Sequence, residues 1–219
     1  MESILHDNPN AEIIRNIIST EWDMFDKVCN LGGRAACQDD SATFFIMRCS
    51  QFLPWEKAVL QSYEEDLKKA KETGENLVEM KYAYMMSFDD PEYFDKYLAS
   101  DMPATGEEKK AAANAAMDMI LKGFREAAEE YPAFTRLGRP ESGSRKDNAG
   151  TSFEVYMRSE LLTYSEKTLG LFLEMIKNKI ESHVNFACEI YENTAKFYGF
   201  ASLEEAESVI EYNSSRSPE

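Results

Sequence analysis

Two halves of this sequence match each other when the chain is shifted by 109 residues, and no gap is needed from about Glu21 to Phe88. Self-similarity at a fixed spacing is typical of duplicated architectures. It predicts two repeats of about 100 residues that pack on each other around a pseudo-twofold axis, because one copy alone would leave an apolar face uncovered. The matched pairs include Glu21 with Glu130, Phe25 with Phe134, Gln51 with Glu160, Asn76 with Asn185, and Tyr82 with Tyr191.

Apolar residues recur at helical spacing in both halves, as in Ile14, Ile17 and Ile18, and no segment alternates as a strand would. The fold class is therefore predicted to be all-α, with one integrated domain. Repeat 1 is expected at residues 11–100 and repeat 2 at residues 107–211. Residues 1–10 and 212–219 are expected to be loose polar tails. Helices are expected at about residues 10–29, 41–53, 55–73, 75–86, 90–98, 107–131, 151–162, 165–179, 181–198 and 202–211.

The overall charge and the cysteine pattern exclude several classes of function. The net charge of −16 argues against binding of nucleic acid and of anionic membranes, because both need clustered Lys and Arg. No basic, apolar leader and no run of about 18 apolar residues is present, so neither export nor a membrane span is expected. The four cysteines form no C-x-x-C pair, which favours free thiols in the cytoplasm. With two histidines, no metal site is predicted, and no motif indicates a cofactor.

Polar residues on apolar helix faces are the main candidates for chemistry. Glu21 lies one turn from both Ile17 and Phe25, and Glu160 lies two turns after Phe153. A carboxylate that points into a core must be paired or have a shifted pKa, so Glu21, Glu130 and Glu160 are candidate general acids or bases. Gln51, Asn76 and Asn185, which also belong to matched polar pairs, are candidates for orienting a ligand.

The second half carries more acidic residues at matched positions than the first. Glu160 replaces Gln51, while Glu189 and Glu192 replace Met80 and Ala83. Such asymmetry is what a specialised pocket would produce in the second half. Neutral drift on a solvated helix face would produce it equally well.

A glycine-rich loop at residues 30–40 is a second candidate site. Gly32 and Gly33 permit unusual backbone angles, and Arg34, together with Arg48, could hold a carboxylate or phosphate. Asp39 and Asp40 could orient Arg34 or hold a hard cation. The structural alternative is a helix end, a salt-bridged loop and a helix cap. Trp55 and Tyr164, at matched helix breaks, could wall a pocket, although core packing explains them as well.

The first-half motif is distinctive and is similar to a bacterial family described only as a domain of unknown function. The resemblance extends from about Glu12 to Glu207, and it implies a stand-alone cytoplasmic protein without a known activity or known catalytic residues. The segments that carry it are Glu21-Trp22-Asp23-Met24-Phe25, Asn30-Leu31-Gly32-Gly33-Arg34-Ala35, Cys37-Gln38-Asp39-Asp40, Ser50-Gln51-Phe52, Thr151-Ser152-Phe153-Glu154, Thr163-Tyr164-Ser165 and Glu192-Asn193-Thr194.

Two functions remain open from the sequence. The first is binding of a small anionic molecule at the seam between the repeats, with possible catalysis by buried carboxylates. The second is a non-catalytic interaction or regulatory module, in which the inward polar residues form a satisfied internal network. A monomer and a homodimer are both compatible with the duplication.

Overall fold

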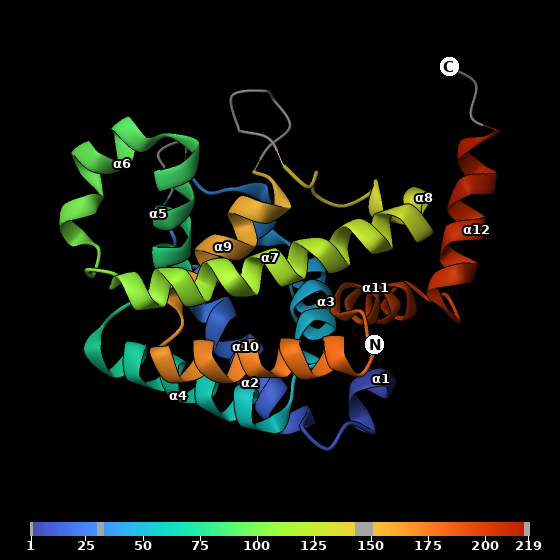
Figure 1. Cartoon of the computed structure of the whole chain (residues 1–219), viewed down its shortest axis with the longest axis horizontal. Coiled ribbons are helices and arrows are strands. Elements are labelled where there is room, and N and C mark those ends of the chain that lie inside the picture. The colour runs from blue at the N-terminus through green and yellow to red at the C-terminus, as the bar shows by residue number, and fades with distance from the viewer. Residues whose placement is uncertain (1, 30–32, 143–150, 217–219) are drawn as a thin grey trace.

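The computed structural model describes residues 2–29, 33–142 and 151–216, and in these ranges it is built from helices alone. Twelve α-helices and two short 3-10 helices account for the described secondary structure (Figure 1). The first half contains α1 (Glu2–His6), α2 (Ala11–Phe25), η1 (Ala36–Asp39), α3 (Ser41–Phe52), α4 (Lys57–Thr73), α5 (Leu77–Asp89), α6 (Pro91–Tyr97) and η2 (Ala99–Asp101). The second half contains α7 (Glu107–Glu130), α8 (Pro132–Thr135), α9 (Phe153–Thr163), α10 (Glu166–Glu181), α11 (Phe186–Phe197) and α12 (Leu203–Ser214).

The helices of the two halves interleave. The long helix α7 runs across the molecule and packs on α9, α10 and α11, as α2 packs on α3, α4 and α5 (Figure 1). Contacts between the halves follow three seams: α5 packs on α9, α3 packs on α11, and α4 packs on α10. The core therefore lies between the halves, and side chains from all three seams form it.

Local chemistry explains where these helices begin and end. The Asp40 carboxylate accepts a hydrogen bond from the Thr43 amide and begins α3, and the Asn76 side chain does the same for the amides of Val78 and Glu79 at the start of α5. Helix α4 ends at Gly74, whose φ of +78° is a left-handed conformation that glycine adopts without strain.

Aromatic side chains fill the centre of the molecule where the α4–α10 seam meets α3 and α9. Tyr164 is fully enclosed, and its ring lies 5.0 Å from that of Tyr63 and 6.0 Å from that of Trp55, measured between centroids. The Trp55 ring also contacts Phe172 at 5.1 Å. The matched aromatics Trp55 and Tyr164 are therefore core residues that touch each other across the seam, in agreement with the packing explanation.

The structure differs from the sequence prediction at the N-terminus and after α7. Residues 2–6 form helix α1 in place of a loose tail, because the Leu5 side chain is buried in the main core with 1% of its surface exposed. The predicted loop at residues 135–150 is preceded by the short helix α8, which Pro132 begins. Residues 30–32, which include Gly32, and residues 143–150 lie outside the described part of the chain.

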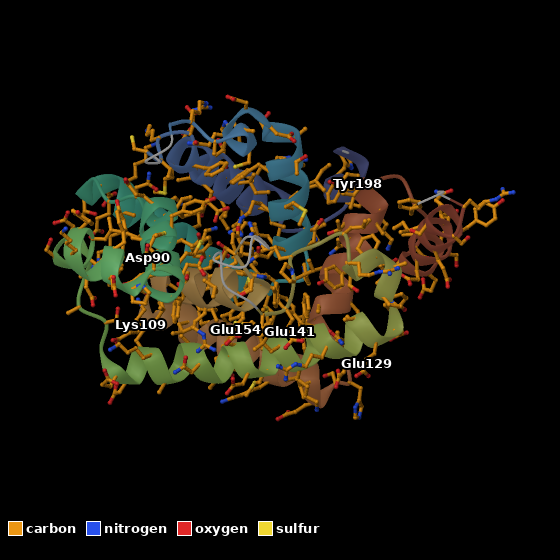
Figure 2. The ribbon with its side chains drawn as sticks, turned by 90° about the horizontal axis from the view of Figure 1, so that it is seen from above. Asp90, Lys109, Glu129, Glu141, Glu154 and Tyr198 are labelled. Atoms are coloured by element: carbon orange, nitrogen blue, oxygen red, sulfur yellow. The ribbon has the colours of Figure 1, made fainter. Side chains whose placement is uncertain are left out.

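Charged side chains lie along α7 and on the segments beside it. Figure 2 shows Lys109 and Glu129 near opposite ends of α7, with Glu141 and Glu154 beside that helix. Among the helices that the structure describes, none is long and apolar enough to cross a membrane.

Candidate functional site

A buried arginine on α3 is the centre of the most polar region inside the molecule. Only 4% of the Arg48 surface is exposed, and its guanidinium makes hydrogen bonds with all five of its N–H groups. Its partners come from three different helices, which the arginine ties together. We call the surrounding group the Arg48 cluster, and it consists of Glu21, Arg48, Gln51, Tyr63, Lys81, Tyr156, Glu160 and Tyr164.

Two carboxylates hold Arg48 from opposite halves of the chain. Glu21, on α2, accepts from Arg48 Nε at 2.7 Å and Nη2 at 2.5 Å, and the Tyr63 hydroxyl donates to the same carboxylate at 2.7 Å. Glu160, on α9, accepts from both terminal nitrogens of Arg48 at 3.1 Å. Both carboxylates are 2% exposed, so each is paired in a region with little water.

Two further donors complete the surroundings of Glu160. The Gln51 amide donates to Glu160 at 2.8 Å, and the Tyr164 hydroxyl donates at 2.9 Å. Burial alone would raise the pKa of Glu160, but the positive charges of Arg48 and Lys81 and these two hydrogen bonds outweigh it and lower the pKa to about 2. Glu160 is therefore a stable carboxylate at neutral pH.

A buried lysine on α5 adds the second positive charge. Lys81 is 7% exposed, and its Nζ donates to the Tyr156 hydroxyl at 2.9 Å and to Glu160 at 3.3 Å. Burial alone would lower the pKa of Lys81, but Tyr156 and Glu160 favour the charged form and raise it overall. The negative charges of Glu21 and Glu160 equal the positive charges of Arg48 and Lys81. This pairing explains how four charged groups are accommodated in the interior.

A cavity of about 200 Å³ lies directly beside the Arg48 cluster, and we call it the Arg48 pocket. Helices α2, α3, α5 and α9 supply most of its wall, and loop residues near η1 and α8 supply the rest. Its lining residues are Glu21, Phe25, Cys37, Asp40, Thr43, Phe44, Met47, Arg48, Val78, Lys81, Tyr82, Arg139 and Tyr156. The wall thus combines buried charges with a flat apolar surface, as ligand pockets commonly do.

Arg139 brings an uncompensated positive charge to this pocket. Its Nη1 donates to the Thr151 carbonyl at 2.9 Å, and its guanidinium lies 4.7 Å from the centre of the Tyr156 ring. Among the residues that the structure describes, no carboxylate pairs with Arg139, which is exposed. The pocket therefore carries a cation that is available to a ligand.

The structure brings together five of the residues that the sequence singled out. Glu21, Arg48, Gln51, Glu160 and Tyr164 all lie in the Arg48 cluster. Trp55 lies behind Tyr164 in the core, outside the pocket lining. Asp40 lines the pocket, although its carboxylate also caps α3.

The other predicted residues lie elsewhere. Glu130 is exposed at the end of α7 and accepts from the Tyr131 hydroxyl at 2.9 Å, so it does not join Glu21. Arg34 forms ion pairs with Asp26 and Asp39 on the exposed loop around η1, as the salt-bridge alternative predicted. The Asn76 and Asn185 side chains cap α5 and α11 and donate to the carbonyls of other helices.

The acids of the second half are divided between two places, since Glu160 lies in the Arg48 cluster while Glu189 and Glu192 line a separate recess between α11 and the N-terminal residues. Glu189 forms an ion pair with Lys179 at 2.7 Å, because the end of α10 lies beside the start of α11. Glu192 accepts from the Leu203 amide at 2.6 Å and so caps α12. Neither carboxylate reaches Glu160 or the Arg48 pocket. Within the described residues, no three His, Cys, Asp or Glu side chains converge as a metal site would require.

Sequence reasoning did not identify Tyr63, Lys81, Arg139 and Tyr156 as site residues. A signal existed for Lys81, since Leu77 and Met85 stand one turn before and after it and both are buried. The same spacing argument had identified Glu21. Tyr156 and Arg139 follow no such pattern, because they reach the pocket through the packing of α9 and of the loop after α8.

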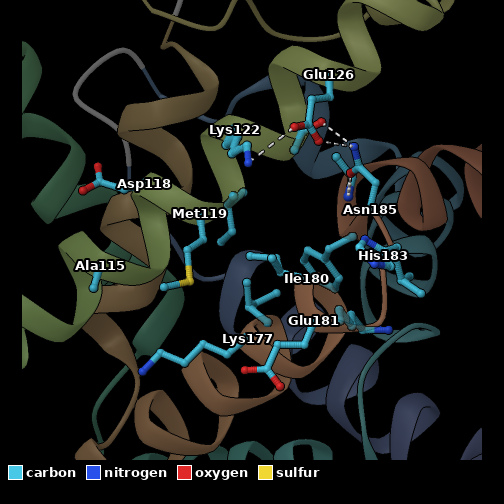
Figure 3. Close-up of a pocket in the computed structure, with 17 residues that line it drawn as sticks. Ala115, Asp118, Met119, Lys122, Glu126, Lys177, Ile180, Glu181, His183 and Asn185 are labelled. Carbon is cyan, nitrogen blue, oxygen red and sulfur yellow. Dashed lines mark hydrogen bonds and ion pairs between the residues drawn. The ribbon is translucent and has the colours of Figure 1, made fainter.

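A larger recess of about 960 Å³ lies between α7 and the turn that joins α10 to α11 (Figure 3). In Figure 3, Lys122, Glu126 and Asn185 form a connected group at one side of this recess, with Met119 and Ile180 at its centre. Its charged side chains carry both signs, and all are exposed except Lys179, which is half-buried and paired with Glu189. It has no buried charge to orient a ligand, so the smaller Arg48 pocket is the stronger candidate site.

Comparison with protein families matches residues 11–208 to a family described as "Protein of unknown function (DUF4125)". The match covers most of the chain. No curated protein and no solved structure matches the chain.

Proposed function

The chain belongs to the DUF4125 family of proteins of unknown function, and we propose that it binds a small anionic molecule in the Arg48 pocket. One observation carries the proposal: Arg139, which no described carboxylate neutralises, borders a pocket that also contains the buried cations Arg48 and Lys81. Glu21 and Glu160 neutralise Arg48 and Lys81, so Arg139 supplies the cation of this pocket that has no ion-pair partner among the described residues. A guanidinium without a carboxylate partner can bind a carboxylate or phosphate through two hydrogen bonds.

The Arg48 cluster has a positioning role in this proposal. Arg48 is fully hydrogen-bonded, and Glu160 has a lowered pKa, whereas a general acid or base works best with a pKa near the working pH. The cluster fixes Lys81 and Tyr156 at the pocket wall through Glu160 and their mutual hydrogen bond. Binding, rather than acid–base catalysis by Glu21 or Glu160, is therefore the function that the contacts support.

The test is a thermal-shift and calorimetric screen of wild-type protein against small carboxylates and phosphates at low ionic strength. A ligand that binds only the folded state raises its stability, by about 2.7 kcal/mol at one hundred times Kd. We expect at least one anion to raise Tm and Arg139→Gln to abolish that rise.

Arg136→Gln is the matched control, because Arg136 is an exposed arginine three positions away that does not line the pocket. It should leave the Tm shift unchanged. If no anion raises Tm in the wild-type protein, or if both arginine variants lose the shift equally, the pocket is not an anion site.

A non-catalytic interaction module is the second candidate function. This candidate is favoured because every N–H group of the Arg48 guanidinium already donates to a protein acceptor. A buried network whose donors are all satisfied needs no ligand to complete it. On this hypothesis the wild-type protein shows no anion-dependent shift, while a variant such as Glu160→Gln still loses stability. The screen therefore separates the two candidates.

We also infer that the two halves are copies related by an approximate twofold axis, with a register that differs from a uniform shift of 109. The rings of Phe25, Phe44 and Tyr82 stack in the first half, and Phe124, Phe153 and Tyr191 make the corresponding contacts in the second. Phe25 and Phe124 are 99 positions apart, whereas the other two pairs are 109 apart. The Asn76 side-chain amide donates to the Met24 carbonyl, and the Asn185 side-chain amide donates to the Gly123 carbonyl. These two carbonyls are again 99 positions apart.

In this register Glu21 corresponds to Ile120, and not to Glu130. Arg48 and Lys81 then correspond to Met157 and Ile190, which are both apolar. The charged side of the site would thus be specific to the first copy, with Glu160 as the contribution of the second. An experimental structure tests this register by superposition of the two halves. We expect α2 to superpose on α7 with smaller Cα deviations when it is shifted by 99 residues than when it is shifted by 109 like the other helices.

A further inference from the structure

The hydrogen-bond donors that face the Arg48 pocket point to a specific class of anion. The Tyr156 hydroxyl accepts from Lys81, and no described residue accepts its own proton. Arg139 uses Nη1 for the Thr151 carbonyl, which leaves its other N–H groups without a described acceptor. A phenol O–H beside a guanidinium matches the two oxygens of a carboxylate, which accept hydrogen bonds only.

The balance of charge in the pocket fits one negative charge. Glu21 and Glu160 are neutralised by Arg48 and Lys81, while the Asp40 carboxylate keeps its negative charge and accepts a hydrogen bond from the amide of Thr43 at a helix start. Arg139 is the cation that has no ion-pair partner among the described lining residues, and it can take one negative charge from a ligand. A dianion would leave one charge unpaired next to the buried carboxylate of Glu21, which low-dielectric surroundings penalise.

The apolar side of the pocket is built from flat rings. Phe25 and Phe44 stack at 5.3 Å between centroids with an angle of 13° between their planes, and Tyr82 continues the stack at 6.1 Å from Phe25. The cavity of about 200 Å³ is somewhat larger than an apolar cavity of about 150 Å³ that binds benzene in another protein, so a single aromatic ring fits it. Its occupant is therefore small, and an aromatic ring makes favourable contacts with aromatic side chains through their edges or their faces.

We infer that the ligand of the Arg48 pocket is a small planar monocarboxylate, of the size of benzoate, with its carboxylate held by Arg139 and the Tyr156 hydroxyl. The inference rests on the proposed function of the pocket and specifies its ligand class. The ring of the ligand would lie along Phe44 and Tyr82, and the carboxylate would face Lys81.

The experiment compares four probes by calorimetry on the full chain: benzoate, benzamide, phenylphosphate and acetate. Benzamide keeps the shape of benzoate without its charge, phenylphosphate adds a second charge, and acetate lacks the ring. We expect benzoate to bind at least tenfold more tightly than each of the other three. Tyr156→Phe keeps the ring and removes one donor, so it should weaken benzoate about tenfold and leave benzamide unchanged.

The outcomes separate this inference from the proposed function. Tighter binding of phenylphosphate or acetate than of benzoate, lost in Arg139→Gln, overturns the ligand class and leaves an anion site in place. Equal binding of benzamide and benzoate shows that charge is not recognised, which overturns both. No binding of any probe together with no shift in the wider anion screen also overturns both. A benzoate affinity unaffected by Tyr156→Phe contradicts the assigned donor pair.

Discussion

At the scale of single residues, the interior charges of this protein are stable because each has its own partners. A buried guanidinium is costly when any of its N–H groups lacks an acceptor, and Arg48 has one for each. The arrangement is vulnerable for the same reason. Removal of one carboxylate leaves a positive charge in the core without compensation.

Glu160→Gln should therefore lower the free energy of unfolding by about 3 kcal/mol, the lower end of the range for breaking a buried ion pair. The glutamine keeps the shape of the side chain but leaves Lys81 without its carboxylate and Arg48 with one. Urea denaturation measures the change. Glu130→Gln is the matched control, since the exposed Glu130 should change stability by no more than about 0.5 kcal/mol. Equal denaturation midpoints for the two variants would contradict the structural role of Glu160.

Sequence predicts those residues of the candidate site that stand at helical spacing from apolar neighbours, and it does not predict the others. Glu21 and Glu160 were identified because they stand on apolar faces, and both are buried in the Arg48 cluster. Lys81 was missed because a lysine with a long apolar stem is usually found at the surface. Glu130 was chosen by analogy with Glu21, and the end of α7 places it in solvent. Whether any of these residues binds a ligand stays a prediction.

At the scale of elements, α7 and the start of α11 approach each other closely at Gly123. A Cβ atom on Gly123 would come within 2.9 Å of Asn185 Oδ1. That oxygen cannot move away without cost, because it accepts from the amides of Ala187 and Cys188 and so caps α11. The glycine is required by the neighbouring helix.

Gly123→Ala should accordingly destabilise the protein by about 1–3 kcal/mol, as overpacking of a close contact does. Gly170→Ala is its control on α10, since a Cβ there would meet no atom within 4 Å. This second change should be neutral or raise stability by up to about 1 kcal/mol, because alanine favours the helix. Thermal denaturation of both variants checks the pair, and equal stabilisation by both would show that α7 and α11 are less closely packed than described.

Helix positions were largely predictable because periodicity and caps are local. Asp40, Asn76 and Gly74 mark the ends of helices in the structure as their chemistry suggests. The short helices α1 and α8 were not predicted, because each depends on contacts with distant parts of the chain. Leu5 is held by the main core, and the amides of Ala133 and Phe134 in α8 are held by the Glu207 carboxylate of α12.

At the scale of the whole molecule, the Arg48 cluster makes folding sensitive to acid. The pKa of Glu160 is lowered to about 2 in the folded protein, because Arg48, Lys81 and two hydrogen bonds outweigh the effect of burial. A carboxylate with a lowered pKa stabilises the folded state above its unfolded pKa and loses that contribution as the pH falls toward its folded pKa. The relevant window is therefore about pH 5 to pH 2.

We expect the stability of the wild-type protein to fall through this window more steeply than that of Glu160→Gln. The difference in free energy of unfolding between the two proteins should be greatest above pH 5 and should shrink toward pH 2. Chemical denaturation at a series of pH values measures it. A difference that stays constant across the series would show that Glu160 is not the group that titrates.

The long separation of Glu160 from Arg48 also affects how the protein is made. Glu160 follows Arg48 by 112 residues, so a ribosome releases α2, α3 and α5 well before α9 exists. During that interval Lys81 has no carboxylate partner in the cluster, and the surfaces that α9, α10 and α11 later cover face water. Domains commonly fold as units during synthesis, at about 5–20 residues per second. Because the core lies between the halves, the first hundred residues therefore wait for several seconds before the helices that cover them are synthesised.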